Sequence, residues 1–483
     1  MYISESLSFE SYMSERRKKP KLPREEYTVT IESMSSEGFG IAKRDGKVVF
    51  VEGGIEGDEA NVQVLKKKSQ YEQTQLLSII KASEFRVEPL CRHFGLCGGC
   101  KWQYADYQAQ LNWKNQTVLD SFQRIGKINI SVSLPILRSP LEYRYRNKLE
   151  FSFSSSKWLT EAELKSDEIF DRRALGFHLP GHFDKILDIQ ECLLMPELIN
   201  EIRNFIKSHA IDKNLTFFNS RDKSGFLRNV MFRYTDYGEL LVLLVVSEYK
   251  KDLIEDVCHQ LQVSFPQITS LYFSINNKVN DTYLDCEMVL YHGKDSVIEK
   301  LGDILFKIGP KSFFQTNSKQ AVRMYESARE MAGLTGKELL YDLYCGVGSI
   351  GLFMADRCSK VIGIEEIESA VKDAEANREL NQLNNCSFFA GDVKRLLNHD
   401  LYNTYGVPDV LITDPPRAGM HEDVCREICN LRPKKVVYIS CNPSTQARDI
   451  QLMNECYEVA MIQPIDMFPH TKHIENIALL IKK

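Results

Sequence analysis

Long apolar runs are missing from this 483-residue sequence. No stretch approaches the ~20 consecutive apolar residues of a membrane-spanning helix, and the first residues lack the basic start and apolar centre of a signal peptide. An excess of positive charge is missing too, because the formal net charge is −5. These absences argue against a membrane protein and against a uniformly basic nucleic-acid coat. We therefore expect a cytoplasmic protein with no membrane partner.

Cysteine, in contrast, is present thirteen times. In a reducing compartment these residues serve as free thiols, metal ligands or a nucleophile more often than as disulfides. The proportions of hydrophobic residues (43%) and charged residues (26%) are those of an ordinary globular protein. The length indicates two to four domains of ~100–200 residues each, and we expect a monomer.

The first part of the chain is strongly basic. Residues 1–22 and the two that follow contain a cationic run, namely Arg16, Arg17, Lys18, Lys19, Lys21 and Arg24. We interpret residues 1–22 as a solvated, flexible tail, with an RNA-contacting arm as the alternative.

Residues 23–83 alternate short apolar runs with glycine-rich turns, a pattern that predicts a small β-barrel. Its cations Arg44, Lys47 and Lys66–Lys68, with Tyr71 nearby, suit contacts to a nucleic-acid backbone and an occasional base. A barrel with an ordinary charged surface explains the same residues, so this segment favours RNA only slightly.

A cluster of cysteines follows the barrel. Cys91, Cys97 and Cys100 have the spacing C-x5-C-x2-C, and Cys192 is the best-placed fourth thiolate. Four sulfurs around one centre suit a tetrahedral zinc ion. They also suit an iron–sulfur cluster whose irons each take one thiolate. The spacing leaves both alternatives open.

Residues 84–300 combine helical and strand patterns, which predicts a mixed α/β domain. Apolar residues keep a helical period from Tyr104 to Ile125. The stretch Tyr143–Lys148 interleaves aromatic and cationic residues before a strand at Leu149–Phe153. Such interleaving suits single-stranded RNA, and a strand edge with solvated arginines is the equal alternative.

The pattern changes in residues 301–483, where strands and helices alternate. A helix from Ser318 to Ala332 is followed by six principal apolar strands. This alternation predicts a doubly wound, mostly parallel sheet. The predicted strands are Glu338–Asp342, Val361–Glu365, Cys386–Phe389, Asp409–Thr413, Val436–Ser440 and Ile477–Ile481.

Ligand-binding signals stand at the ends of these strands. A G-x-G-x-x-G turn lies within Asp342–Gly351, Glu365 ends the next strand, and Asp392 follows the third. A glycine turn with carboxylates at successive strand ends favours an adenosyl ligand. Asp414 precedes two prolines in a shaped loop after strand four and is placed to bond the polar edge of a planar base.

The strand Val436–Ser440 ends in Cys441, directly before Asn442-Pro443. A thiol at the carboxyl end of such a strand lies where open α/β sheets keep their reactive groups. Sulfur added to C6 of a pyrimidine would turn C5 into a carbon that accepts a methyl group from a sulfonium donor. The C5 proton then needs a base; our candidate is Glu475, with His473 as the alternative.

These motifs, in this order, resemble the RNA uracil-5-methyltransferase family, in particular its bacterial 23S ribosomal RNA members with a TRAM barrel and an iron–sulfur cluster. The resemblance extends over residues ~27 to 483. It rests on the glycine-rich barrel, the cysteine set and five motifs, namely Phe-Phe-Gln-Thr-Asn, Asp-Leu-Tyr-Cys-Gly-Val-Gly, Asp-Pro-Pro-Arg, Ser-Cys-Asn-Pro and His-Ile-Glu.

The resemblance implies a multidomain α/β protein: an OB-like TRAM barrel, a central α/β domain with an iron–sulfur cluster, and a C-terminal Rossmann-like methyltransferase domain. It implies a [4Fe–4S] cluster on Cys91, Cys97, Cys100 and Cys192, by analogy and not by spacing. The implied S-adenosylmethionine contacts are Gln315, Tyr344, Glu365 and Asp414.

The implied reaction is methylation of C5 of a uridine in RNA, with Cys441 as nucleophile and Glu475 as base. Ribosomal RNA is the favoured substrate and transfer RNA the alternative. Two rivals from other classes remain: an RNA-binding or ribosome assembly factor without activity, and a radical S-adenosylmethionine enzyme. Intact Cys441 and Asp414 oppose the first, and four thiolates beside a separate cofactor fold oppose the second.

Overall fold

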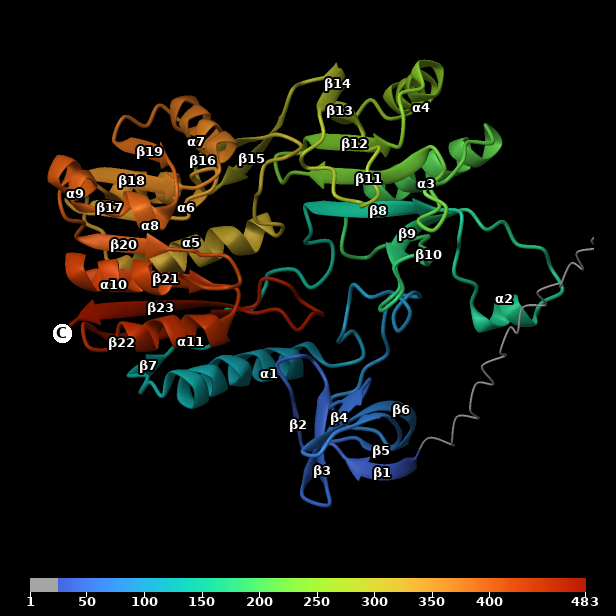
Figure 1. Ribbon diagram of the computed structural model, residues 1–483, viewed down its shortest axis with the longest axis horizontal. Coiled ribbons are helices and arrows are strands. Elements are labelled where there is room, and N and C mark those ends of the chain that lie inside the picture. The colour runs from blue at the N-terminus through green and yellow to red at the C-terminus, as the bar shows by residue number, and fades with distance from the viewer. Residues whose placement is uncertain (1–24) are drawn as a thin grey trace, which may run out of the picture. The chain divides into compact units, whose positions relative to one another are not determined.

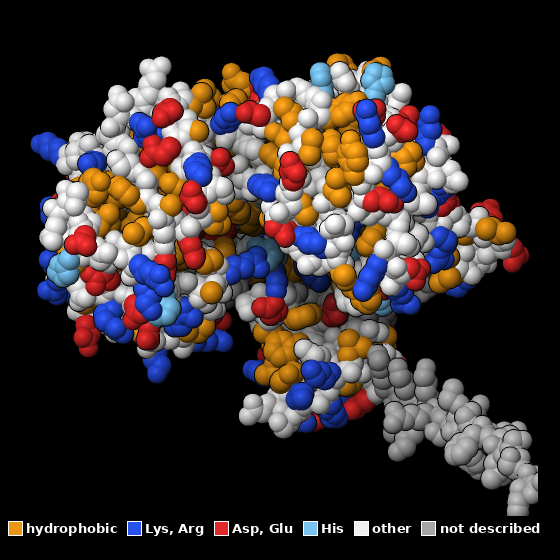
Figure 2. Space-filling view, turned by 45° about the horizontal axis from the view of Figure 1, so that its top comes forward, with side chains coloured by type: hydrophobic (Ala, Val, Ile, Leu, Met, Phe, Trp, Pro, Cys, Tyr) orange, Lys and Arg blue, Asp and Glu red, His pale blue; other side chains and the backbone are white. Residues whose placement is uncertain are grey.

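The computed structural model describes residues 25–483, so the basic tail of residues 1–22 lies outside the described residues. Two compact units are present: the first holds the described residues up to Ser35 and Phe39–Phe85, and the second holds Ser36–Gly38 and Arg86–Lys483. No helix in the described part of the chain has both the length and the apolar character needed to cross a membrane. Acidic and basic side chains are interspersed over the visible face (Figure 2).

The first unit is one curved six-stranded sheet around a small apolar core of Val, Ile and Ala side chains. Its strand order is β1-β5-β6-β4-β3-β2, and every pairing is antiparallel except that of β4 with β6. Glycines at positive φ between the strands make the turns. The strands are β1 (Glu26–Thr30), β2 (Ser33–Met34), β3 (Gly40–Arg44), β4 (Lys47–Glu52), β5 (Glu59–Lys67) and β6 (Tyr71–Lys81).

A mixed seven-stranded sheet forms the middle of the second unit (Figure 1), in the order β10-β9-β8-β11-β12-β13-β14. Helices α3 and α4 share an apolar core with one of its faces. The elements are β8 (Lys148–Ser154), α2 (Glu161–Lys165), β9 (Ala174–His178), β10 (Ile186–Asp188), α3 (Glu197–Asp212), β11 (Leu227–Tyr234), β12 (Leu240–Val246), α4 (Lys251–Ser264), β13 (Ile268–Ile275) and β14 (Met288–Gly293).

An eight-stranded sheet follows, in the order β19-β18-β17-β20-β21-β23-β22-β7. It is parallel from β19 to β21, and β23 runs antiparallel to both of its neighbours. The expected doubly wound arrangement is confirmed, with β20 beside β17 and β21 beside β20. The strands are β17 (Leu339–Leu343), β18 (Lys360–Glu365), β19 (Cys386–Ala390), β20 (Val410–Thr413), β21 (Lys435–Ser440), β22 (Tyr457–Ile465), β23 (Glu475–Lys482) and β7 (Val132–Ser133).

Helices cover both faces of this sheet, which explains its continuous apolar strands. Its remaining elements include a β15–β16 hairpin. They are β15 (Val297–Leu301), β16 (Ile304–Ile308), α5 (Ser318–Ala332), α6 (Ser349–Met354), η2 (Ala355–Arg357), α7 (Glu368–Leu380), α8 (Val393–Leu396), α9 (His399–Tyr405), α10 (Glu422–Leu431) and α11 (Pro443–Leu452).

The long helix α1 (Tyr107–Asp120), with its wider last turn η1 (Ser121–Gly126), comes early in the chain yet packs on this C-terminal sheet. Val118 and Phe122 are fully buried there beside α10 and α11. The central sheet also contributes to the core under α5, through residues such as Met231 and Leu243. The central and C-terminal parts therefore share one apolar core.

Candidate active site

The thiol of Cys441 lies between the end of β21 and the start of α11. The strand before it is fully buried, and the helix after it begins at Asn442, whose side chain accepts a hydrogen bond from the Ser444 N–H at 3.2 Å. An asparagine N-cap followed by proline at the first helical position is a strong helix start. The chain must therefore turn at Cys441, and the thiol stands at a helix N-terminus, where a thiolate is favoured.

Arg417, in the loop after β20, is fastened to this turn through its backbone. Its carbonyl accepts hydrogen bonds from Asn442 Nδ2 at 3.1 Å and from Thr445 Oγ1 at 3.2 Å. Its guanidinium Nη2 donates to Nδ1 of His473 at 3.1 Å. Arg417, Cys441 and His473 line one cavity of about 160 Å³, so a cation faces the thiol across a small cleft.

Two carboxyl groups lie close to the thiol. Burial and the nearby Glu475 and Asp414 raise the pKa of Cys441 to about 11, although Arg417 opposes them. Glu475 is the first residue of β23 and is 5% exposed. Burial raises the pKa of Glu475 well above its ordinary value and raises that of Asp414 to about 7. The structure thus brings together the three groups at the ends of β20, β21 and β23.

His473 has a different character. Burial, with the neighbouring Arg417, lowers the pKa of His473 to about 4, so the ring is neutral near pH 7. Because Nδ1 accepts the hydrogen bond from Arg417, the proton of the neutral ring is on Nε2. The Nδ1 lone pair that a base would use is therefore occupied by the Arg417 hydrogen bond.

The glycine turn after β17 forms an open cradle. Tyr344 and Gly346 have positive φ values of 62° and 55°, and a Cβ on Gly346 would meet nothing within 4 Å. Glu365, at the end of β18, accepts hydrogen bonds from the Gly346 N–H at 3.0 Å and the Ile367 N–H at 2.9 Å. Backbone and carboxylate thus face an open space at the carboxyl edge of the sheet, where a ligand can approach.

Asp342, which the sequence did not single out as a site residue, lies beneath this cradle. Its Oδ2 accepts a hydrogen bond from the Gly351 N–H at 2.8 Å, and its Oδ1 is buried with no partner in residues 25–483. Burial, with Asp414 and Glu365, raises the pKa of Asp342 to about 8. Asp342 therefore lies near both carboxyl groups, and its Oδ1 is left without a partner among the described residues.

The backbone around Gln315 is held by hydrogen bonds from Asn147. Its carbonyl accepts a hydrogen bond from Asn147 Nδ2 at 2.9 Å, and the neighbouring Thr316 carbonyl accepts one from the Asn147 N–H at 2.9 Å. Two residues later α5 begins at its N-cap, Asn317. The side chain of Gln315 is partly exposed, so it is accessible to a ligand.

The four predicted metal-ligating cysteines converge. Cys91, Cys97, Cys100 and Cys192 line one cavity of about 190 Å³. Burial, with the other thiols of the set, raises the pKa of Cys97 to about 11 and that of Cys100 to about 12. No group of three or more His, Cys, Asp or Glu side chains among the described residues has the arrangement of a metal-ion site. The four thiols nevertheless line a common cavity.

The basic and aromatic stretch Tyr143–Lys148 makes contacts within the protein. Arg144 donates to the carbonyls of Cys192 and Met195 and forms ion pairs with Glu191 and Glu197. These contacts fasten the loop that carries the fourth cysteine. Arg144 is therefore paired within the protein, unlike the solvated arginine of the second alternative, and contact of this stretch with RNA stays a prediction.

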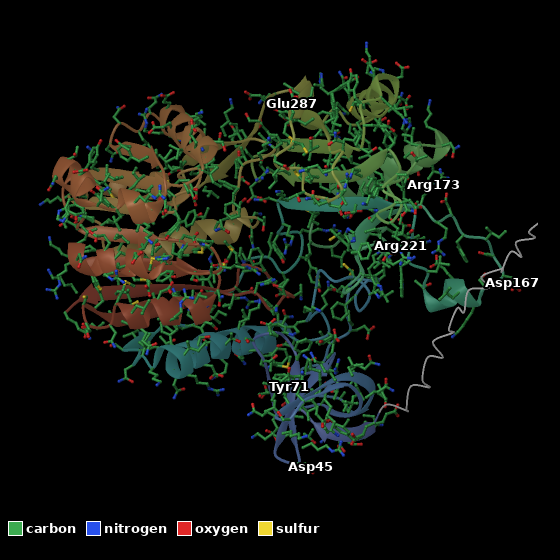
Figure 3. The ribbon with its side chains drawn as sticks, viewed as in Figure 1. Asp45, Tyr71, Asp167, Arg173, Arg221 and Glu287 are labelled. Carbon is green, nitrogen blue, oxygen red and sulfur yellow. The ribbon has the colours of Figure 1, made fainter. Side chains whose placement is uncertain are left out.

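Some cations of the barrel are also paired. Arg44 lies 3.8 Å from the ring centroid of Tyr27 and bonds Glu25 at 2.8 Å, and Lys67 bonds Glu25 at 2.9 Å. Lys66 and Lys68 are exposed, and no ion pair involves them within the described chain. Tyr71 (Figure 3) packs edge-on against Phe50. Lys66 and Lys68, which flank Lys67, therefore contribute positive charge outside these ion pairs, as does Lys47.

Comparison with known proteins gives a consistent result. The profile of the tRNA (uracil-5-)-methyltransferase family matches residues 106–483, and that of the TRAM domain matches residues 20–77. A protein of Bacteroides thetaiotaomicron named as an uncharacterized RNA methyltransferase is 46% identical over 92% of this chain and 99% of its own length. A second, from Chlorobaculum tepidum and similarly named, is 39% identical over 94% of this chain and 95% of its own.

A solved structure is similar over nearly the whole length. It is that of the Pyrococcus abyssi tRNA (uracil-54, C5)-methyltransferase in complex with S-adenosyl-L-homocysteine. The TM-score is 0.74 and the sequence identity 27%, with 94% of this chain and 100% of that chain covered.

Proposed function

This chain belongs to the tRNA (uracil-5-)-methyltransferase family, whose members are RNA (uracil-5-)-methyltransferases that use S-adenosylmethionine, and we propose that its reaction proceeds through a covalent adduct on Cys441. The observation that carries the proposal is the grouping of Cys441, Asp414 and Glu475 at neighbouring strand ends. A nucleophile, a polar contact for a base and a proton acceptor are the groups that methylation at C5 requires.

Each group then has one task. The Cys441 thiolate forms a bond to C6 of a uracil that has left its stack, because stacked neighbours would cover the ring face. S-adenosylmethionine supplies an electrophilic methyl group on a sulfonium. Glu475, in its ionised form, takes the proton that leaves C5, and the C6–S bond breaks to restore the ring and the thiolate. Asp414 is proposed to bond the polar edge of the base or the donor beside it.

The cradle residues fit the methyl donor. Gly346 opens onto free space, Glu365 ends the neighbouring strand, and Asp342 Oδ1 has no partner within residues 25–483. We propose that Gln315, Tyr344, Glu365 and Asp414 contact S-adenosylmethionine. Glu365 is placed to accept the ribose hydroxyl groups, as acidic residues at this strand end do.

The adduct can be trapped. RNA that contains 5-fluorouridine should remain bound to the protein, because fluorine cannot leave as a proton and the final elimination is blocked. We expect a denaturation-resistant complex with the parent and with Cys429→Ala, a partly buried cysteine of α10. Cys441→Ala should give none, and recovery of an adduct from it would overturn the assignment.

Glu475→Gln separates addition from elimination. The amide cannot accept the C5 proton, so we expect the covalent complex with ordinary uridine RNA to accumulate while release of 5-methyluridine slows by about 10²–10⁴-fold. Unchanged turnover would remove the role of Glu475, and in that case His473 becomes the base to test.

The cysteine cavity is lined by four thiols, the number that an iron–sulfur cluster with one thiolate on each of four irons takes. We propose that Cys91, Cys97, Cys100 and Cys192 hold a [4Fe–4S] cluster, which would link the chain around residue 95 to the loop at residue 192. The expected content is roughly four iron atoms and four acid-labile sulfides per chain. A zinc content of about one with no sulfide would contradict it.

The RNA substrate can be mapped directly. We propose a uridine of 23S ribosomal RNA, because the barrel and cluster architecture resembles the ribosomal RNA enzymes. Transfer RNA is the second candidate, since the structurally similar protein acts on tRNA uracil 54. Mapping 5-methyluridine in total RNA from cells with and without this protein decides between them.

A further inference from the structure

The loop between β22 and β23, residues 466–474, leads directly to Glu475 and contains His473. It has no secondary structure of its own, yet most of its residues are buried, and His470 is in the left-handed region with φ of 64°. A loop in such a conformation keeps one shape only when its surroundings hold it there. The partners of this loop therefore decide where the proposed base lies.

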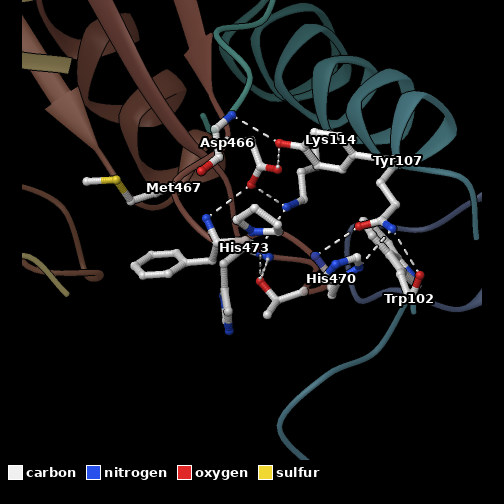
Figure 4. Close-up of polar contacts among 12 residues, drawn as sticks. Trp102, Tyr107, Lys114, Asp466, Met467, His470 and His473 are labelled. Carbon is white, nitrogen blue, oxygen red and sulfur yellow. Dashed lines mark hydrogen bonds and ion pairs between the residues drawn. The ribbon is translucent and has the colours of Figure 1, made fainter. Parts of the chain in front are cut away.

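Helix α1 holds the beginning of the loop (Figure 4). Lys114 Nζ donates to Asp466 Oδ1 at 2.6 Å and to the Phe468 carbonyl at 3.0 Å, and the Tyr107 hydroxyl donates to Asp466 Oδ2 at 2.9 Å. The side chains of Lys114 and Asp466 are both fully buried. A buried charge pair with further hydrogen bonds has little freedom to rearrange.

The segment that carries the cysteines holds the middle of the loop. The N–H groups of Lys101 and Trp102, which directly follow Cys100, both donate to the His470 carbonyl, at 2.8 and 3.1 Å. Gln110 accepts from the His470 N–H at 2.9 Å and donates to the Trp102 carbonyl at 3.0 Å. The cysteine segment and the loop thus share two direct hydrogen bonds, and the Gln110 side chain of α1 bridges them with two more.

The wall of the cysteine cavity makes two further contacts. Arg146 lines the cavity, and its guanidinium lies 5.3 Å from the centroid of the Phe468 ring. The adjacent Tyr145, which is 6% exposed, donates its hydroxyl to the Pro469 carbonyl at 3.1 Å. Contacts from around the cavity therefore converge on three consecutive loop residues, Phe468, Pro469 and His470.

We propose that the cysteine segment is a positioning element of the methyl-transfer site: it holds Phe468, Pro469 and His470 so that Glu475 stays beside Cys441. The inference rests on the proposed function of Cys441 and Glu475. Tyr145 and Gln110 are positioning residues, since they touch the loop and not the reacting atoms. The cysteine site is therefore a mechanical support of the catalytic centre, and its loss loosens the loop.

Tyr145→Phe removes the one hydroxyl group that joins residue 145 to the loop, and so tests whether this contact holds the loop in place. The matched control is Tyr457→Phe, because the buried Tyr457 also donates to a proline carbonyl, that of Pro433, at 3.1 Å. We expect hydrogen–deuterium exchange of peptides covering residues 466–474 to accelerate several-fold in Tyr145→Phe and to remain at the parent level in Tyr457→Phe. Exchange at the parent level in Tyr145→Phe would overturn the proposal.

Kinetics separate positioning from general destabilisation. A misplaced proton acceptor lowers kcat, and a displacement near 1 Å costs on the order of 10²-fold. The Tyr145 hydroxyl donates to the Pro469 carbonyl of the loop and not to a residue of the proposed donor cradle. We expect Tyr145→Phe to lower kcat by about tenfold with KM for S-adenosylmethionine unchanged. A rise in KM with kcat unchanged would contradict positioning.

Cys100→Ser tests the other end of the link, with Cys286→Ser as the control at a partly buried cysteine outside the cavity. We expect faster exchange over residues 466–474 only in Cys100→Ser, and parent-level exchange there would overturn the proposal. If Cys100→Ser does not fold, Tyr145→Phe alone decides. Exchange is measured without RNA or methyl donor, so a failure of the proposed function shows separately, as absence of the 5-fluorouridine adduct.

Discussion

The groups around the Cys441 thiol disfavour its ionisation. Burial and two carboxyl groups raise its pKa, to about 11, and Arg417 is the neighbour that lowers it. A nucleophilic cysteine must lose its proton near neutral pH, so it needs a cation or a base. Arg417 supplies that positive charge and is held in place by its own backbone carbonyl.

Arg417→Gln should therefore make Cys441 harder to ionise. We expect the pH at which iodoacetamide alkylates Cys441 to rise by about one unit, which lowers the rate near pH 8 roughly tenfold. Arg417→Lys should restore part of the alkylation rate, because lysine keeps the positive charge but not the planar geometry of the guanidinium. Mass spectrometry of Cys441 peptides, with Cys286 as an internal reference, gives the rates.

A control for this experiment is Arg448→Gln, since Arg448 is already paired with Asp449. Its alkylation profile should match that of the parent. If Arg417→Gln leaves the pH profile of Cys441 unchanged, then another group ionises the thiol.

The sequence singles out Asp414 and Cys441 because each follows an apolar strand, and Glu475 because it precedes the last strand. Arg417 belongs to the Asp-Pro-Pro-Arg motif, yet nothing in the sequence predicted that it would lie beside Cys441. Its position depends on two hydrogen bonds to residues 442 and 445, which are ~25 residues along the chain. Asp342 was missed for a similar reason, since its isolation is a property of the folded sheet.

At the scale of elements, the hydrophobic periodicity of the sequence was sufficient to predict the bounds of a helix or strand that has one apolar face. The predicted helix Ser318–Ala332 has these bounds in the structure, with Asn317 as N-cap and Gly333 as C-cap. The six predicted strands are present within one or two residues at most ends. Strand β22 was not predicted, because Pro464 interrupts its pattern, and β7 has only two residues.

Long-range contacts were beyond the sequence at this scale too. The stretch Tyr143–Lys148 has the composition of an RNA-binding segment, and its partners Glu191, Cys192 and Pro469 are 47 or more residues distant along the chain. The burial of an arginine or tyrosine by such distant partners cannot be recognised in the local sequence. The same holds for α1, whose contacts are with the far end of the chain.

The ion pair that joins α1 to the loop after β22 makes a prediction for stability. Lys114→Met leaves Asp466 buried without its cation, which costs about 3–5 kcal/mol. Adding Asp466→Asn should recover much of this loss, because the stranded charge is gone. Urea unfolding of the full-length parent, both single variants and the double variant gives the coupling free energy; additive effects would contradict a buried pair.

The β5–β6 hairpin of the barrel makes a prediction for RNA binding. Lys66 and Lys68 are exposed and outside the ion pairs that Lys67 makes with Glu25 and Glu72. If these two lysines contact phosphates, Lys66→Ser with Lys68→Ser should weaken RNA binding and reduce the salt slope by about one per lysine. Lys67→Ser, the control, should change both much less; an equal effect would contradict this assignment.

On the scale of the whole molecule, the order of strands places the site. Parallel strands β17, β18, β20 and β21 all end at one edge, so Asp342, Glu365, Asp414 and Cys441 meet there. The chain then reverses in β23, which brings Glu475 to the same edge from the opposite direction. Alternating strand and helix patterns predicted the parallel part, whereas the antiparallel return follows from tertiary packing.

This gathering of carboxyl groups has a consequence for stability. Burial raises the pKa of Asp414 to about 7 and that of Asp342 to about 8, whereas an unfolded chain has values near ~3.9. Between roughly pH 4 and 8 the folded protein therefore binds more protons than the unfolded one. By linkage, each such group makes the free energy of unfolding fall as pH rises, by at most about 1.4 kcal/mol per pH unit.

We therefore expect the ligand-free protein to be more stable at pH 5.5 than at pH 8, and Asp414→Asn to flatten that dependence, because its amide does not titrate. Asp409→Asn is the control of opposite sign. The hydrogen bond from Lys434 lowers the pKa of Asp409, so its contribution is constant above pH ~4 and is lost only as pH falls below that. Urea unfolding midpoints of the three proteins at several pH values test this. Equal slopes for the parent and Asp414→Asn would mean that Asp414 is ionised in the folded protein.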